Sequence, residues 1–299
     1  MPSLSLRLTR SLLGLIGNQL RDADKFRDQI LKRPAQDVAP FPRKLLREAH
    51  VEQRDVNGWR VYTLTPQSRP SRWHIVYIHG GAWVYELAAP HWWIIRALIR
   101  ATGATVTVPI YPLAPQHTYR DAYPLLAEVY RQVLTETAAE NIVFCGDSAG
   151  GGLAAGLALH TRELTLPMPA RLVLFAPAVD LTFSNPEVDA IEPHDKLIAR
   201  PGGHVAASWW AGGDDIRSPL ISPMYGDLRG LPPVDIFQGT EDSLLPDTRV
   251  FRDRLREAGV AVQLFEYPGA FHVFMGATYT PEARDTYRKV AAALPRAGA

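Results

Sequence analysis

A serine that could act as a nucleophile lies in the segment GDSAG, at residues 146–150. An apolar stretch precedes this segment and a helical pattern follows it, and this is the setting in which G-x-S-x-G presents a reactive hydroxyl. A serine in such a turn takes a left-handed backbone conformation, so the residues two positions away must lack a Cβ. A plain glycine-rich turn or a phosphate loop is the alternative, but no G-x-x-x-x-G-K-[ST] or G-x-G-x-x-G opens the helix. The pattern predicts that Ser148 is a nucleophile.

Backbone donors for an oxyanion are expected in HGGAW, residues 79–83, directly after the apolar run WHIVYIH. A tetrahedral intermediate needs N–H groups aimed at its negative oxygen, and glycines at a strand end allow the main chain to approach closely. A tight turn without catalytic purpose is the alternative, and His79 is expected to be structural in either case. The predicted donors are the N–H groups of Gly80, Gly81, Ala82 and Ala149, of which Gly80 is the weakest candidate.

Four short blocks together carry a family resemblance. They are HGG at 79–81, YPLAP at 111–115, GDSAGG at 146–151 and PGAFH at 268–272. From about residue 56 to its end, the sequence resembles the hormone-sensitive-lipase-like (family IV) esterases of the α/β-hydrolase superfamily. The resemblance implies esterases of short acyl chains with a Ser-Asp-His triad, a helical cap and no cofactor.

Two residues depart from the pattern of this family. Ala82 stands where the family usually has a third glycine, and Gln116 stands where it usually has a glutamate. The first change leaves an N–H in place but restricts the turn, and the second removes a charge near the outer part of the site. HGG-x-W is also similar to the arylformamidases, which extends the expected leaving group from an alcohol to an amine.

A base and an acid are expected after the last two predicted strands, because the superfamily order is serine, acid, histidine. His272 follows the strand at 262–267, and Asp242, which matches the D-x-L pattern of the family, follows the strand at 234–237. Glu241 and Asp247 are rival acids that could instead flank or cap the next helix. His272 would take the proton of Ser148, so activity should rise with pH through an apparent pKa of about 6–7. No H-E-x-x-H segment or Cys/His cluster occurs, and no metal is expected.

Aromatic residues are abundant near these motifs. We expect some of them to line an apolar pocket for the acyl or alcohol group, although filling of the core or of a cap interface is the alternative. The predicted substrate-binding residues are Trp83, Tyr85, Trp209 and Trp210.

The order of elements predicts an α/β-hydrolase fold with a mostly parallel central sheet and helices on both faces. Apolar strands are predicted at 56–64, 73–79, 104–110, 142–145, 172–175, 234–237 and 262–267, with Asn57-Gly58 as a turn or bulge inside the first. Helices are predicted at about 90–100, 119–137, 153–160, 247–258 and 281–293.

Two further segments are expected to form a helical cap. Residues 1–50 show helical patterns and proline-punctuated loops, and the insertion at about 177–220 contains no clear strand. We predict an N-terminal cap segment, 1–50, and one α/β-hydrolase domain, 51–299, that carries the inserted segment. One helical face near the N-terminus is expected to pack on the body, a secretory leader being the alternative. It consists of Leu8, Leu12, Leu15, Ile16 and Leu20.

Composition excludes several other classes of protein. The 299 residues carry 32 Lys+Arg against 31 Asp+Glu, so the net charge of +1 gives no support to nucleic acid or an anionic membrane as the main partner. No run approaches the roughly 18 apolar residues of a membrane span. Cys145 is the only cysteine, so no internal disulfide can form and a cytoplasmic location is expected. The resemblance makes a homodimer a possible assembly.

Three classes of function fit these observations. The first is a carboxylesterase of small apolar esters, and the second is a lactone or aryl-formamide hydrolase, or an acyltransferase, with the same triad. The third is a non-catalytic receptor for a small ligand, since the plant gibberellin receptors resemble this family but lack the catalytic histidine. His272 argues against the third class.

Overall fold

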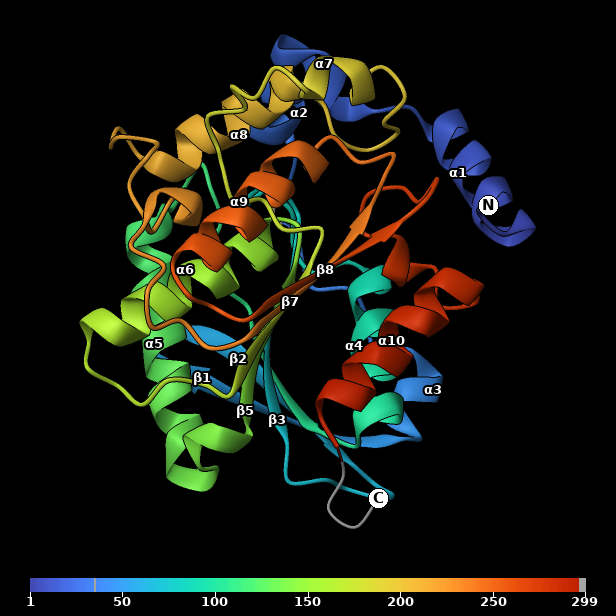
Figure 1. Cartoon of the computed structure of the whole chain (residues 1–299). Helices are drawn as coiled ribbons and strands as arrows, with labels where there is room; N and C mark the ends of the chain where they lie inside the picture. Colours follow the sequence, from blue (N-terminus) through green and yellow to red (C-terminus); the bar gives the residue numbers. More distant parts are fainter. Residues whose placement is uncertain (35, 296–299) are drawn as a thin grey trace.

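The central element is an eight-stranded sheet, seen in a computed structural model that describes residues 1–34 and 36–295 (Figure 1). The strand order is β1-β2-β4-β3-β5-β6-β7-β8, and all neighbours from β4 to β8 are parallel. The predicted α/β-hydrolase fold with a mostly parallel sheet is confirmed. The strands are β1 (Ala49–Val56), β2 (Trp59–Pro66), β3 (His74–Ile78), β4 (Thr105–Pro109), β5 (Ile142–Asp147), β6 (Arg171–Phe175), β7 (Val234–Gly239) and β8 (Val262–Tyr267).

The first predicted strand, 56–64, is wrong in extent, because the chain folds there into a hairpin. β1 and β2 pair antiparallel around Asn57-Gly58, and both turn residues have positive φ, 54° and 86°. Two such residues fit the turn that the twist of a hairpin favours. β1 is an edge strand with only its two end residues buried. It therefore lacks the apolar alternation by which strands are recognised.

Helices cover both faces of the sheet (Figure 1). One face carries α3 (Arg43–Leu46), α4 (Ala89–Thr102) and α10 (Pro281–Ala293), and the other carries α5 (Tyr119–Glu136), α6 (Ala149–Glu163) and α9 (Leu245–Glu257). Alternate residues of β3 enter the two resulting cores, Tyr77 on the side of α4 and Ile78 on the side of α6. Burial on both faces explains why this strand is apolar throughout. Short 3₁₀ turns lie at Ala139–Asn141, Pro223–Tyr225 and Phe274–Gly276.

The N-terminal and inserted segments lie together at one end of the molecule (Figure 1). They contain α1 (Leu4–Ile16), a 3₁₀ turn at Gln19–Arg21, α2 (Ala23–Lys32), α7 (Val188–Ile191) and α8 (Arg200–Ala211). Phe26 of α2 stacks on Trp209 of α8, with 6.3 Å between ring centroids. Gly202 of α8 is so close to Leu20 that a Cβ there would lie 2.7 Å from it. We propose that α1, α2, α7 and α8 form the predicted cap. The predicted boundary of the N-terminal cap segment, 1–50, is too long, because α3 lies on a face of the sheet and β1 begins at Ala49.

The predicted packing of the leucine face of α1 is wrong. Leu8, Leu12 and Leu15 are exposed, while Leu6, on the opposite side of the helix, is fully buried. Leu20 is buried as expected, but in the turn that follows α1. The side chain of Ile16 lies outside the described part of the structure. In the described ranges, no helix is both long and apolar enough to cross a membrane.

Candidate active site

Ser148 stands at a strained turn between β5 and α6. Its φ of 54° and ψ of −124° lie outside the regions that serine normally occupies. A Cβ on Gly146 would overlap the carbonyl of Gly150, and a Cβ on Gly150 would overlap the carbonyl oxygen of Ile78. Both glycines of the motif are therefore required for steric reasons. The turn places the hydroxyl at the N-terminus of α6, in the wall of a cavity.

Three side chains from different parts of the chain form a hydrogen-bonded series. The Ser148 Oγ lies 2.8 Å from the Nε2 of His272, and the Nδ1 of His272 lies 2.8 Å from the Oδ2 of Asp242. Asp242 follows β7 and His272 follows β8, so the parallel sheet delivers both to the edge at which β5 ends. An imidazole between a carboxylate and a hydroxyl can take the hydroxyl proton. The structure thus brings together the three residues that the sequence predicted.

The charge state of His272 is set by opposing influences. Burial disfavours the imidazolium, but the negative charge and hydrogen bond of Asp242, with the charges of Asp195 and Asp147, outweigh burial. The pKa of His272 is therefore raised above its ordinary value of 6.5. A raised pKa makes the imidazole a stronger base toward a hydroxyl.

Asp195, which sequence reasoning missed, supports the acid from the inserted segment. Its carboxylate is fully buried and accepts N–H bonds from Ser243 at 2.7 Å, Leu197 at 2.8 Å and Ile198 at 3.0 Å. Burial and the nearby charge of Asp242 raise its pKa. The bond to Ser243 ties the inserted segment to the residue after Asp242. An acidic residue in an irregular segment gave no local signal for this long-range contact.

The two rival acids lie elsewhere. Glu241 forms an ion pair with Arg10 at 3.1 Å. Asp247 accepts a bond from the side chain of Asn185 at 2.9 Å, and burial raises the pKa of Asp247 to about 6. Within the described residues, the only carboxylate that bonds the imidazole of His272 is that of Asp242.

The HGGAW loop turns sharply beside Ser148. Gly81, Ala82 and Trp83 all have positive φ, at 124°, 50° and 59°. The N–H of Gly80 donates to the Oδ1 of Asp147 at 3.1 Å, so Gly80 is not a free oxyanion donor and its weak candidacy is wrong. The N–H groups of Gly81, Ala82 and Ala149 make no hydrogen bond to any residue that the structure describes. Ala149 begins α6, whose first N–H groups have no partner inside the helix.

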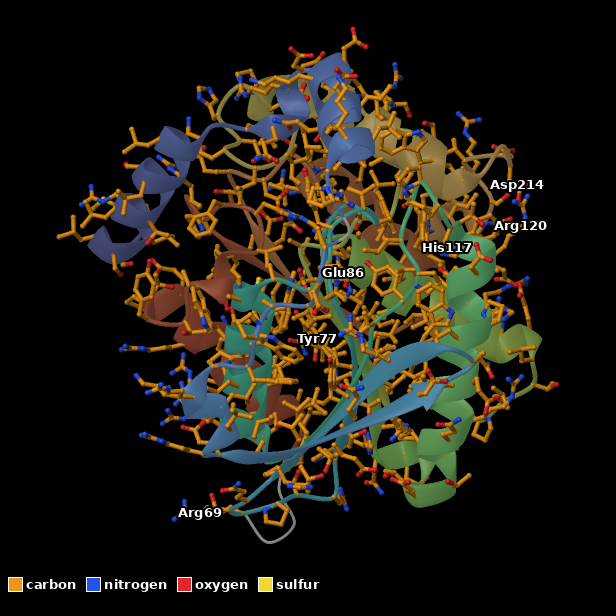
Figure 2. The ribbon with its side chains drawn as sticks, turned by 180° about the vertical axis from the view of Figure 1, so that it is seen from behind. Arg69, Tyr77, Glu86, His117, Arg120 and Asp214 are labelled. Carbon is orange, nitrogen blue, oxygen red and sulfur yellow. The ribbon has the colours of Figure 1, made fainter. Side chains whose placement is uncertain are left out.

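The side chain of Asp147 holds the HGGAW loop in place through hydrogen bonds. Its buried carboxylate accepts hydrogen bonds from the hydroxyl of Tyr77 and the N–H of Gly80, and the Nε2 of His91 lies 3.4 Å away. Tyr77, labelled in the view from behind (Figure 2), is fully buried. His79 is also buried, donates from Nδ1 to the carbonyl of Gly80 at 2.7 Å, and burial lowers its pKa to about 3. A neutral, buried His79 stabilises the loop, which is the structural role that the sequence predicted.

A cavity of about 550 Å³ lies beside Ser148 and His272. Of the four predicted aromatic residues, only Tyr85 lines it. Trp83 and Trp210 are instead buried and stack on each other at 6.1 Å, while Trp209 stacks on Phe26. The prediction that these three tryptophans line the pocket is wrong, because they fill the contact between body and cap segments. Other residues in its wall are Leu13, Leu20, Trp93, Ile94, Ile198 and Tyr279.

No group of three or more His, Cys, Asp or Glu residues in the described ranges could hold a metal ion. Cys145 is buried, and burial raises the pKa of its thiol.

Comparison with known proteins decides the family. Residues 75–276 match the family model described as the alpha/beta hydrolase fold. The chain belongs to the α/β-hydrolase fold family. It falls in the hormone-sensitive-lipase-like branch, as its motifs predicted, because a solved hormone-sensitive lipase from a metagenome library superposes on it. That structure has a TM-score of 0.82, with 27% identity over 98% of each chain.

Curated relatives of this hydrolase are also similar along most of their length. A carboxylesterase of Mycobacterium tuberculosis strain H37Rv is 31% identical over 278 residues, which cover 86% of this chain and 85% of the relative. An esterase of Acinetobacter venetianus is 32% identical over 221 residues, which cover 73% of each chain.

Proposed function

We propose that this hydrolase is a serine carboxylesterase that cleaves small apolar esters of short to medium acyl chain through an acyl-enzyme. Its family and its relatives make it a carboxylic ester hydrolase. The observation that supports the finer proposal is the series Ser148–His272–Asp242, with both links at 2.8 Å, at the wall of a mainly apolar cavity.

The proposed reaction begins at Ser148. As its Oγ attacks the acyl carbonyl carbon, the Nε2 of His272 takes the hydroxyl proton. Asp242 holds the imidazole in the required tautomer and stabilises the imidazolium. The imidazolium then donates its proton to the departing alcohol, and the acyl group remains on Ser148. A water molecule, deprotonated by the same imidazole, then attacks the acyl carbonyl carbon. The acid leaves as the bond to Ser148 breaks and the imidazolium returns its proton to the Oγ of Ser148.

The oxyanion of each tetrahedral intermediate needs preorganised donors. We assign this role to the unpaired N–H groups of Gly81, Ala82 and Ala149. Ala82 has a positive φ, which costs on the order of 1 kcal/mol. The turn at Ala82 follows Gly80, whose own N–H is already bonded to Asp147. Losing one such donor raises the barrier by about 2.7–4 kcal/mol.

The cavity supports small apolar substrates. Its volume of about 550 Å³ is in the usual range for pockets that hold small molecules. Leucine, isoleucine and aromatic side chains contribute much of its wall, which favours hydrocarbon groups on the ester. The intact hydrogen bond between Ser148 and His272 disfavours a non-catalytic receptor. A cytoplasmic location and a homodimer stay predictions.

Hydrolysis of p-nitrophenyl acetate and butyrate by wild type and by Ser148→Ala tests the proposal. Wild type should turn over both esters, and the variant should lose at least about 10³-fold in kcat, since the nucleophile is gone. Ser243→Ala is the matched control, because Ser243 is a buried serine next to Asp242 whose hydroxyl makes no hydrogen bond to any residue that the structure describes. Equal activity of Ser148→Ala and wild type would exclude the acyl-enzyme route. A panel of lactones and aryl formamides then defines the bond that is preferred.

A further inference from the structure

Exposed large hydrophobic side chains gather at one place on the molecule. The structure describes ten of them, and five lie between Met1 and Leu15. Two others, Trp93 and Tyr279, line the cavity beside Ser148. Single exposed apolar residues are ordinary on a protein surface, but a contiguous group indicates an interaction site. The remaining three, Leu31, Leu46 and Val250, are scattered over α2, α3 and α9.

The gathering is an unbroken stripe along α1, which we call the leucine stripe. It consists of Leu4, Leu8, Leu12 and Leu15, which are 63%, 56%, 62% and 84% exposed. Their spacing of three and four residues places them on one face of the helix. The opposite face carries the buried Leu6 and the partly buried Leu13. α1 lies at the edge of the molecule (Figure 1), and side chains project from it away from the body (Figure 2).

This helix also borders the cavity that contains Ser148. Thr9 and Leu13 belong to the cavity wall, and the hydroxyl of Thr9 lies 2.6 Å from that of Tyr279. Trp93, 44% exposed, belongs to the same wall. The leucine stripe is therefore the outer side of a helix whose inner side forms part of the substrate pocket. A surface that held the stripe would therefore lie beside the wall of the cavity that contains Ser148.

The charges of α1 are all positive. Arg7 and Arg10 are its only ionisable residues, and Arg7 is exposed. Arg10 forms its ion pair with Glu241 on the body. Helices that lie in a lipid–water interface combine an apolar face with cationic flanks that attract anionic headgroups. Arg7 supplies one such cation beside the leucine stripe.

The size of the stripe argues against a second copy of the chain as its occupant. At the exposures given above, the four leucines offer roughly 500 Å², so a stable protein interface of ~800 Å² per partner would also have to bury polar residues beside them. A lipid surface needs no matching partner, because its acyl region accepts a narrow ridge of side chains. We propose that the leucine stripe of α1 docks this protein on an anionic lipid–water interface. The proposal does not depend on the proposed esterase activity.

Sedimentation with vesicles tests the proposal. The probes are vesicles of phosphatidylcholine alone and of phosphatidylcholine mixed with phosphatidylglycerol. The full chain should bind both and should prefer the anionic mixture, with a preference that salt weakens. The double variant Leu8→Ser/Leu12→Ser should partition at least about tenfold more weakly, because each buried leucine favours the apolar phase. Arg7→Glu should lose the preference for anionic vesicles.

The control variant Leu31→Ser/Leu46→Ser removes two equally exposed leucines outside the stripe and should bind like wild type. Leu8 and Leu12 do not line the cavity, so hydrolysis of soluble p-nitrophenyl acetate should stay unchanged in the stripe variant. Ser148→Ala should bind vesicles normally, which separates docking from catalysis.

The proposal is wrong if wild type binds neither kind of vesicle, or if the control loses binding as much as the stripe variant. It is also wrong if wild type is a dimer in the ultracentrifuge and Leu8→Ser/Leu12→Ser is a monomer. The stripe would then be a contact between two copies of the chain.

Discussion

Replacing Asp242 by asparagine is the change whose outcome the geometry defines most sharply. The Oδ1 of Asp242 accepts the N–H of Leu244 at 3.0 Å, and its Oδ2 faces the Nδ1 of His272 at 2.8 Å. In the asparagine variant, the carbonyl oxygen must keep facing Leu244, because two N–H donors cannot bond each other. The amide NH₂ must therefore face His272. The structure thus dictates the orientation of the new side chain.

This orientation inverts the tautomer of the imidazole. With a donor opposite Nδ1, the ring proton of His272 moves to Nε2, which then cannot accept the proton of Ser148. The same change in a Ser-His-Asp triad lowers kcat by about 10⁴-fold. That factor corresponds to a barrier higher by about 5.5 kcal/mol. The protein should remain folded, because the replacement is isosteric.

Steady-state hydrolysis of p-nitrophenyl butyrate measures the effect, and the two rival acids provide controls. Asp247→Asn replaces a carboxylate that is also buried but bonds Asn185, and Glu241→Gln breaks only the contact with Arg10. Both should keep kcat within a few-fold of wild type. A loss of less than tenfold in Asp242→Asn, or an equal loss in Asp247→Asn, would refute the assignment of the acid.

Three further predictions concern pH and stability. First, kcat/KM should rise with pH through a single pKa above 6.5, because only neutral His272 can take the proton, and a flat profile between about pH 5 and 9 would count against this. Second, Asp195→Asn should move this rise to lower pH, since the negative charge of Asp195 raises the pKa of His272. An unmoved pH profile would show that the Asp195 side chain acts only by accepting N–H bonds from the main chain around it. Third, Trp83→Ala should lower the free energy of unfolding by about 3–5 kcal/mol in urea titrations and leave acyl-chain preference unchanged, because Trp83 is buried away from the cavity. A changed chain preference at full stability would restore Trp83 to the pocket.

The sequence predicted the sheet well because its central strands are buried on both faces. Continuous apolar runs such as 73–79 have no other stable location, and the glycines of GDSAG have a steric cause that the sequence itself displays. β1 was missed because an edge strand with two solvent-facing sides needs no apolar pattern. Such a segment is defined by its partner strand rather than by its own residues.

The errors at the site have a common origin in long-range packing. Periodicity favoured the face of Leu8, Leu12 and Leu15 on α1, but the side that packs on the body is that of Leu6, which no local pattern distinguishes. Indole side chains suit a pocket and a core equally, so the burial of Trp83 and Trp210 could not be known. Asp195 reaches Ser243 across 48 residues of sequence, and Gly80 reaches Asp147 across 67. No local pattern encodes such pairs.

Covalent labelling tests directly whether Ser148 is the nucleophile. The wild-type protein is treated with diethyl p-nitrophenyl phosphate, which transfers its phosphoryl group to an activated serine and releases p-nitrophenolate. One p-nitrophenolate should be released per chain, ester hydrolysis should be lost, and mass spectrometry should find a single modified peptide with the label on Ser148. The Ser148→Ala variant should take up no label. Full inhibition with the label on another residue, or continued hydrolysis by a chain labelled at Ser148, would show that Ser148 is not the nucleophile.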